Sequence, residues 1–313
     1  MAEITSSPAA LAHPGPDEPH PAQVVQLGSA KGGWFRQVGW RHLVGCVALV
    51  FSLFPILFVL SAALNPVGTL SSAQLIPTGA SLTNFEELFT ETQYPRWFFN
   101  TMLIGLLSSA ASMFISAAAA YAFSRFRFRG RRPALLAILL VQMFPALLAI
   151  VVLYLMFTTI TEYYPAIGFN TPWALILIYL GGALGVNTWL MKGFFDTIPK
   201  DLDESAKVDG ATHAQIFFGI ILPLVRPILA VTALLGFIAT VSDVMLANIF
   251  LTDPESKTVA IGLYGLVAAG RARETNFGVF AAGAIITAIP TVVLFQILQR
   301  YIVGGITAGA VKG

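Results

Sequence analysis

Residues 199–227 read PKDLDESAKVDGATHAQIFFGIILPLVRP, a charged segment between two long apolar runs. Four carboxylates and two lysines gather in its first half. The segment predicts two short helices broken by a turn, with Asp201 capping the first helix and Glu204 three residues later bonding back to the backbone. Gly210 stands where the turn needs a residue without a Cβ.

The second helix, and one face of the first, follow from the same local chemistry. Thr212 and Gln215 repeat the capping arrangement for the second helix. Ser205 and Ala206 keep one side of the first helix small, so that another surface can approach it closely. A capped, polar, small-faced helix pair between apolar runs is expected to be a docking surface. Composition alone favours the other reading, a solvated loop helix, and it is the order of the residues that indicates docking.

The composition of the whole chain is that of an integral membrane protein. Among 313 residues, 56% are hydrophobic and only 11% are charged, and the mean hydropathy is +0.76. The single cysteine, Cys46, excludes an intrachain disulfide. Residues 1–35 are rich in proline and have no apolar period, which predicts a disordered cytoplasmic tail. A six-helix membrane domain is expected over residues 36–313.

Six apolar runs are long enough to cross a hydrocarbon core, which takes about 20 helical residues. Pro145 falls inside the third run, where a kink is tolerable, and Gly181 with Gly185 suits close helix packing in the fourth. The charged segment, taken as residues 199–223, separates the fourth run from the fifth. The spans are expected near residues 43–64, 98–123, 134–158, 172–194, 226–250 and 277–302.

The distribution of basic residues predicts the orientation. Fourteen of the eighteen Lys and Arg residues fall in the N-terminal tail, the loop after the second span, the charged segment and the C-terminus. By the positive-inside rule these regions are cytoplasmic, and both termini on one side require an even number of spans. The expected location is the plasma (inner) membrane, in contact with lipid.

No motif for catalysis is present in the sequence. There is no G-x-x-x-x-G-K-[ST] run, no Cys/His cluster at metal spacing and no convincing G-x-S-x-G turn. No catalytic, cofactor-binding or metal-binding residue is therefore predicted, and no nucleic-acid partner. If ATP powers this protein, ATP and Mg²⁺ are used by another chain.

Asp243 is the one clear ionisable residue within the expected spans. A charge there costs a few kcal/mol, so it should face protein or water. It is predicted either to contact the translocation path or to make a helix-packing hydrogen bond, and Asn187 and Asn100 carry the same two readings. Near the second span, Tyr94 and Trp97 read as an interfacial aromatic belt.

The order of residues in the charged segment resembles a family signature. Glu204-Ser205-Ala206, three residues, Gly210, nine residues and then Ile220-x-Leu222-Pro223 is similar to the E-A-A, G, I-x-L-P signature of ABC importer permeases, with serine replacing the first alanine. Three further stretches look like the smaller permease subunit of the maltose/maltodextrin group: WFFNTMLIG (97–105), YAFSRFRFRGR (121–131) and QRYIVGGITAGAVKG (299–313).

This resemblance, over roughly residues 36–313, implies the type I importer permease fold: an all-α membrane protein of six helices with a cytoplasmic coupling helix pair between helices 4 and 5. It implies pairing with a second, different permease, two ATPase subunits and an extracytoplasmic sugar-binding protein. The residues implied to dock the ATPase are Glu204, Ser205, Ala206, Asp209, Gly210, Ala211, Leu222 and Pro223. The resemblance also implies a C-terminal tail that contacts the ATPase. Its contact residues are Thr307, Ala308, Gly309, Lys312 and Gly313.

The function expected from this reading is ATP-driven import by alternating access, with no enzyme activity on this chain. The cargo is expected to be maltose, maltodextrin or a related sugar such as trehalose. One alternative is the same architecture serving a polyol or a glycerol phosphate. An ion-coupled secondary transporter is a second alternative, and the scarcity of charge within the spans counts against it.

Overall fold

The computed structural model describes residues 38–70, 73–74, 79–268 and 275–310, with side chains left out of the description at 146–147 and 303–310. The chain divides into two units, residues 1–52 and 53–313. In the first unit the described residues contain the start of helix α1. The expected disordered tail over residues 1–35 lies outside the described residues.

All regular elements in the described part of the chain are helical. Most are α-helices, and the named exceptions are a 3₁₀ turn (η2) and a π-helical segment (η3). In chain order they are α1 (Trp40–Leu64), α2 (Thr83–Thr90), α3 (Tyr94–Arg125), α4 (Arg131–Gln142), α5 (Ala146–Tyr163), η2 (Pro165–Ile167), α6 (Pro172–Gly181), α7 (Val186–Asp196), α8 (Asp201–Val208), α9 (His213–Ile216), η3 (Phe217–Ile221), α10 (Leu222–Leu224), α11 (Arg226–Ser242), α12 (Met245–Phe250), α13 (Val259–Val267) and α15 (Phe277–Ala310).

Three helices among the described residues are long and apolar enough to cross a membrane: α1, α3 and residues 277–302 of α15. Two bent pairs raise that number to five if each pair forms one span. α6 and α7 meet at an angle of 53°, and the segment from α9 to α10 meets α11 at 80°. The expectation of an all-helical membrane protein is confirmed, with three to five candidate spans.

Helical structure is interrupted within the third, fourth and fifth expected spans. The third divides into α4 and α5, because Pro145 cannot donate to the preceding turn and disfavours helix at the residue before it. The fourth is interrupted at residues 182–185, where the expected packing glycines lie. The fifth ends early at Asp243, whose backbone is extended, with ψ of 116°.

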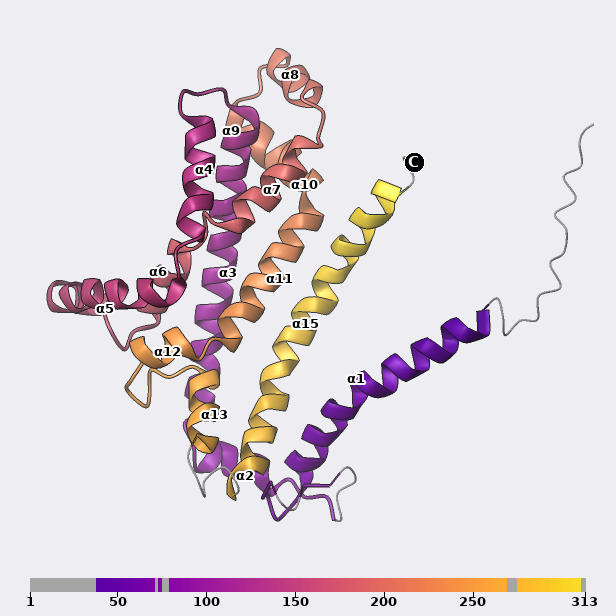
Figure 1. The fold of residues 1–313 in the computed structure, drawn as a ribbon, viewed down its shortest axis with the longest axis vertical. Helices are drawn as coiled ribbons and strands as arrows, with labels where there is room; N and C mark the ends of the chain where they lie inside the picture. Colours follow the sequence, from indigo (N-terminus) through magenta and orange to yellow (C-terminus); the bar gives the residue numbers. More distant parts are fainter. Residues whose placement is uncertain (1–37, 71–72, 75–78, 269–274, 311–313) are drawn as a thin grey trace, which may run out of the picture. The chain divides into compact units, whose positions relative to one another are not determined.

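Helix α3 organises the second unit (Figure 1). It packs against α6, α7, α11 and α13. Three buried apolar clusters follow it from the Tyr94 end to the Arg125 end, where α7, α9 and η3 join it. In Figure 1, α8 projects past this second end. The helix therefore connects α8 to the opposite end of the unit.

At its Tyr94 end, α3 is held by neutral side chains that donate to backbone carbonyls. Tyr94 Oη donates to Gly283 O over 3.0 Å, and Trp97 Nε1 donates to Pro254 O over 2.9 Å. Tyr94 is 1% exposed and Trp97 8%. The interfacial-belt reading of these two rings is wrong, because their polar atoms find partners within the protein.

Candidate coupling site

Helix α8 begins at Asp201, the residue that was expected to cap it. Lys200 occupies the N-cap position and makes no side-chain cap, whereas Asp201 is the first helical residue. The prediction that Asp201 caps the helix is therefore wrong. Asp201, Asp203 and Glu204 all lie in the first turn, where carboxylates interact favourably with the positive end of the helix dipole.

The end of α8 confirms the expected turn at Gly210. The amide of Gly210 donates to Lys207 O over 3.0 Å, and that of Ala211 donates to Ala206 O over 2.9 Å. This pair of bonds is a Schellman motif. The motif requires the left-handed conformation at the first residue after the helix cap, which is Gly210. Gly210 has a φ of +83°, a conformation that L-residues with a Cβ adopt only at a cost.

Beyond this turn, α9 begins with the expected capping box. Thr212 Oγ1 accepts from the amide of Gln215 over 3.3 Å, and Gln215 Oε1 accepts from the amide of Thr212 over 2.8 Å. Ile216 and Ile221 are then fully buried against α3 and α7. The capped second helix is thus fastened to the membrane-spanning helices by apolar contacts.

The first helix is fastened by an ion pair that the sequence reading missed. Arg125 Nε lies 2.5 Å from Asp203 Oδ2, and the two side chains are 5% and 7% exposed. Arg125 Nη2 also donates to Ile198 O over 3.1 Å. Among the described residues no donor reaches the other oxygen, Asp203 Oδ1. The buried carboxylate therefore depends on Arg125.

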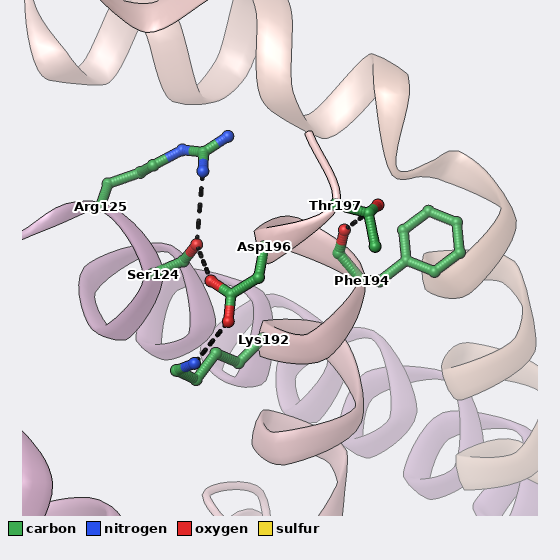
Figure 2. Close-up of polar contacts among 6 residues, drawn as sticks. All are labelled: Ser124, Arg125, Lys192, Phe194, Asp196 and Thr197. Atoms are coloured by element: carbon green, nitrogen blue, oxygen red, sulfur yellow. Dashed lines mark hydrogen bonds and ion pairs between the residues drawn. The ribbon is translucent and has the colours of Figure 1, made fainter. Parts of the chain in front are cut away.

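A second polar cluster continues from this ion pair along α3 and α7 (Figure 2). Arg125 Nη1 lies 3.5 Å from Ser124 Oγ, which donates to Asp196 Oδ1 over 2.6 Å. Lys192 Nζ lies 2.5 Å from Asp196 Oδ2. Charge-assisted bonds of this kind are stronger than neutral ones. Together they join the end of α3 to the end of α7 and, through Asp203, to α8.

The predicted docking residues divide into an exposed set and a packed set. Ala206, Ala211, Leu222 and Pro223 are half-buried, and all but Pro223 pack against the apolar cluster below α8 and α9. The other predicted docking residues, Glu204, Ser205, Asp209 and Gly210, are exposed. Val208, beside them on α8, is 88% exposed. We call this set the exposed face of α8.

The predicted C-terminal contacts fall largely beyond what the structure describes. Thr307, Ala308 and Gly309 lie on the backbone of α15, with side chains outside the described set. Lys312 and Gly313 lie outside the described residues altogether. Their expected contact with an ATPase stays a prediction.

Two of the three predicted path residues meet at one cavity. Asp243 and Asn187 line an open-sided space of about 480 Å³, together with residues of α3, α5, α6, α7, α11 and α12. Asp243 also makes the alternative helix-packing bond, since Tyr179 Oη donates to its Oδ2 over 2.7 Å. Asn100 lies elsewhere: its Nδ2 donates to Glu255 O and Lys257 O, over 2.9 and 3.1 Å.

Comparison with known sequences decides the family. The profile of the family described as "Binding-protein-dependent transport system inner membrane component" matches residues 111–307. The chain belongs to this family. It is therefore a multi-pass inner-membrane permease of an ABC import system, and a solute-binding protein and an ATPase are its partners.

Named relatives match this permease over most of its length. It is 42% identical to the galactooligosaccharides transport system permease protein GanQ of Bacillus subtilis, over 88% of this chain and 95% of that one. It is 40% identical to the maltodextrin transport system permease protein MdxG of the same organism, over 83% and 91%. Identity to the maltose/maltodextrin transport system permease protein MalG of Yersinia pestis is 39%, over 89% and 94%.

Solved structures confirm the fold. A chain of a bacterial ABC transporter involved in the import of the acidic polysaccharide alginate aligns with a TM-score of 0.70 at 20% identity, covering 85% of this permease and 97% of that chain. A chain of the alginate transporter in complex with its pentasaccharide-bound periplasmic protein aligns at 0.60 and 19%. The predicted importer-permease fold is thus supported independently of the sequence matches.

Proposed function

We propose that the permease is one of two different membrane subunits of an ATP-driven importer for a di- or oligosaccharide of the maltodextrin or galactooligosaccharide type. The names of the relatives at 39–42% identity support the substrate class. Trehalose remains within the same proposal as a disaccharide. Two copies of an ATPase bind on the cytoplasmic side and use ATP and Mg²⁺.

The proposal rests on the position of α8, which exposes one face and is bonded to α3 through the other. Its exposed face, which includes Glu204, is free to enter a cleft of the ATPase. Its inner face is tied to α3 by the Arg125–Asp203 ion pair. Because a short helix held on one side by a buried pair moves together with α3, a displacement of the exposed face reaches the membrane-spanning helices.

This mechanism sets the topology that we propose. The chain crosses the membrane six times, with α4 and α5 forming one crossing and each bent pair forming another. Both termini and α8 are then cytoplasmic, which agrees with the concentration of basic residues on that side. Closure of the two ATPases would shift α3, α7 and α11 between inward-facing and outward-facing arrangements.

Reconstitution in proteoliposomes tests the proposal. The permease, its partner permease, the ATPase and the binding protein are co-purified and reconstituted, and uptake of maltotriose, trehalose and galactobiose is measured. Uptake should require ATP on the ATPase side and should survive collapse of the proton gradient. Uptake without ATP, or uptake abolished by a protonophore, would contradict an ATP-driven importer.

A further inference from the structure

The cavity beside α3 is bordered by two interruptions of helical structure. The break between α6 and α7 contributes Gly182 and Ala183, and the break between α11 and α12 contributes Asp243. At membrane depth, non-helical backbone is tolerated where it is buried in protein or lines a water-filled cavity. Discontinuous helices also form the solute sites of many other membrane transporters. Both breaks meeting at one space therefore indicate a hydrated cavity.

The cavity lies near the middle of α3. Ser108, Ser109 and Ser112 face it from α3, which runs from Tyr94 to Arg125. The expected membrane crossing of this helix centres on the same serines. A solute moving between the two ends of α3 would pass this level.

Asn187 offers hydrogen-bonding capacity to the cavity. It is half-buried, and no hydrogen bond of its side-chain amide is found among the described residues. An amide carries two donors and an acceptor with two lone pairs. A half-buried group of this kind is satisfied by water or by a polar solute.

Asp243 offers one further acceptor to the same cavity. Its Oδ1 accepts from the amides of Met245 and Leu246, over 2.8 and 3.2 Å, and its Oδ2 accepts from Tyr179. A carboxylate has about four acceptor sites, so about one remains on Oδ2. The three internal bonds hold the group in a fixed position.

We propose that this cavity binds the solute in transit as a neutral polyhydroxylated ring, with Asn187 and Asp243 hydrogen-bonding its hydroxyl groups. This inference rests on the proposed function. The volume of about 480 Å³ falls within the usual range for small-molecule sites, about 300–1,000 Å³. The apolar remainder of the wall, including Ile178 and Leu246, suits the less polar faces of a sugar ring.

Cysteine labelling tests whether the cavity holds water and sugar. Cys46 is the one cysteine in the sequence, so Cys46→Ser gives a background without thiols. In this background Ser112→Cys should react with a small water-soluble methanethiosulfonate, whereas Leu106→Cys, exposed on α3 but outside the cavity, should react far more slowly. Saturating maltotriose or galactobiose, whichever the reconstituted importer carries, should slow labelling of Ser112→Cys at least about fivefold.

A control shows that protection is local. Ser205→Cys on α8 should be labelled at the same rate with and without sugar. Labelling of Ser112→Cys that sugar leaves unchanged would overturn the proposal. An unreactive Ser112→Cys would also overturn it, since the space would then be filled by the partner permease or by lipid.

Transport measurements supply a second, independent test. Asn187→Leu keeps a similar volume but removes the amide, and the sugar imported per ATP hydrolysed should fall about five- to tenfold, the loss of roughly one net hydrogen bond. Asn187→Gln should retain most of the transport. Equal transport by Asn187→Leu and the unmodified permease would count against the site.

These tests separate the two proposals. If the unmodified complex imports no sugar with ATP, the proposed function fails. If it imports sugar while Ser112→Cys is not protected and Asn187→Leu is unimpaired, the cavity proposal alone fails. Stimulation of ATP hydrolysis by the binding protein reports in each variant whether the complex has assembled.

Discussion

The two ends of α3 are fastened by different chemistry. At the Tyr94 end, neutral donors such as Trp97 and Asn100 bond to backbone carbonyls of the segment before α13. At the other end, Arg125 and Asp203 form a buried ion pair between two side chains. Bonds to backbone carbonyls fix an interface, whereas an ion pair to a short helix positions that helix and transmits its displacement. We therefore assign a stabilising role to the contacts at the Tyr94 end of α3 and a coupling role to those at the Arg125 end.

Removal of one partner of the ion pair should have the largest effect. Asp203→Ala leaves the Arg125 guanidinium buried without its carboxylate, and breaking a buried pair from one side costs about 3–5 kcal/mol. The sugar imported per ATP hydrolysed should fall roughly a hundredfold. The measurement is uptake and ATP hydrolysis in the same proteoliposomes.

Two controls accompany this prediction. Glu87→Ala removes an exposed carboxylate from α2, next to the opposite end of α3, and should leave coupling unchanged. The double variant Arg125→Met/Asp203→Leu replaces both charges by apolar groups, and should recover most of the loss because neither charge is left alone. Normal coupling in Asp203→Ala would contradict the coupling role assigned to the Arg125 end of α3.

The turn after α8 should give the next largest effect. Gly210→Ala places a Cβ on a residue with φ of +83°, at a cost of about 1–2 kcal/mol. Recovery of the ATPase in co-purification should fall about five- to thirtyfold. Gly219→Ala, where a Cβ meets no atom within 4 Å, is the matched control. Equal losses in the two variants would argue against a specific role for the turn.

The local chemistry of the coupling region was predictable, whereas its attachment was not. Gly210 and the Thr212–Gln215 capping box follow from spacing within a few residues. The pairing of Arg125 with Asp203 depends on how α3 and α8 meet, 78 positions apart in the chain. An arginine directly after an apolar span and a carboxylate in the docking segment were the available signals.

Helix breaks show the same limit of local patterns. Hydropathy identified the apolar runs, but it does not register a bend such as the 53° between α6 and α7. Pro145 signalled one break, because proline interrupts a helix for a covalent reason. At Asp243 the side chain accepts from the amides of Met245 and Leu246, a local Asx-type turn. The sequence reading assigned this aspartate to the translocation path or to helix packing instead.

Neutralising the exposed carboxylate should give a smaller effect. Glu204→Gln keeps the shape of the side chain but weakens a charge-assisted bond to a basic group of the ATPase. The Kd for the ATPase should rise about two- to tenfold at low salt, with little difference at high salt. Glu162→Gln, also exposed but at the end of α5, is the control. A Glu204→Gln complex as tight as the unmodified one at low salt would contradict the prediction.

The smallest effect on coupling is expected at the opposite end of α3. Asn100→Ala removes two bonds to carbonyls and should lower the free energy of unfolding by about 1–3 kcal/mol, measured by thermal unfolding in detergent. Coupling in the assembled complex should change by less than about twofold. Lost coupling together with unchanged stability would reverse the roles assigned to the two ends.

Cross-linking of the exposed face of α8 tests the central claim most directly. In the Cys46→Ser background, Ser205→Cys is treated with a thiol-directed photocross-linker in membranes that contain the assembled complex. The predicted product is a covalent adduct with the ATPase, absent for Phe89→Cys on α2, which is exposed near the other end of α3. An adduct of the ATPase with Phe89→Cys and none with Ser205→Cys would contradict docking through α8.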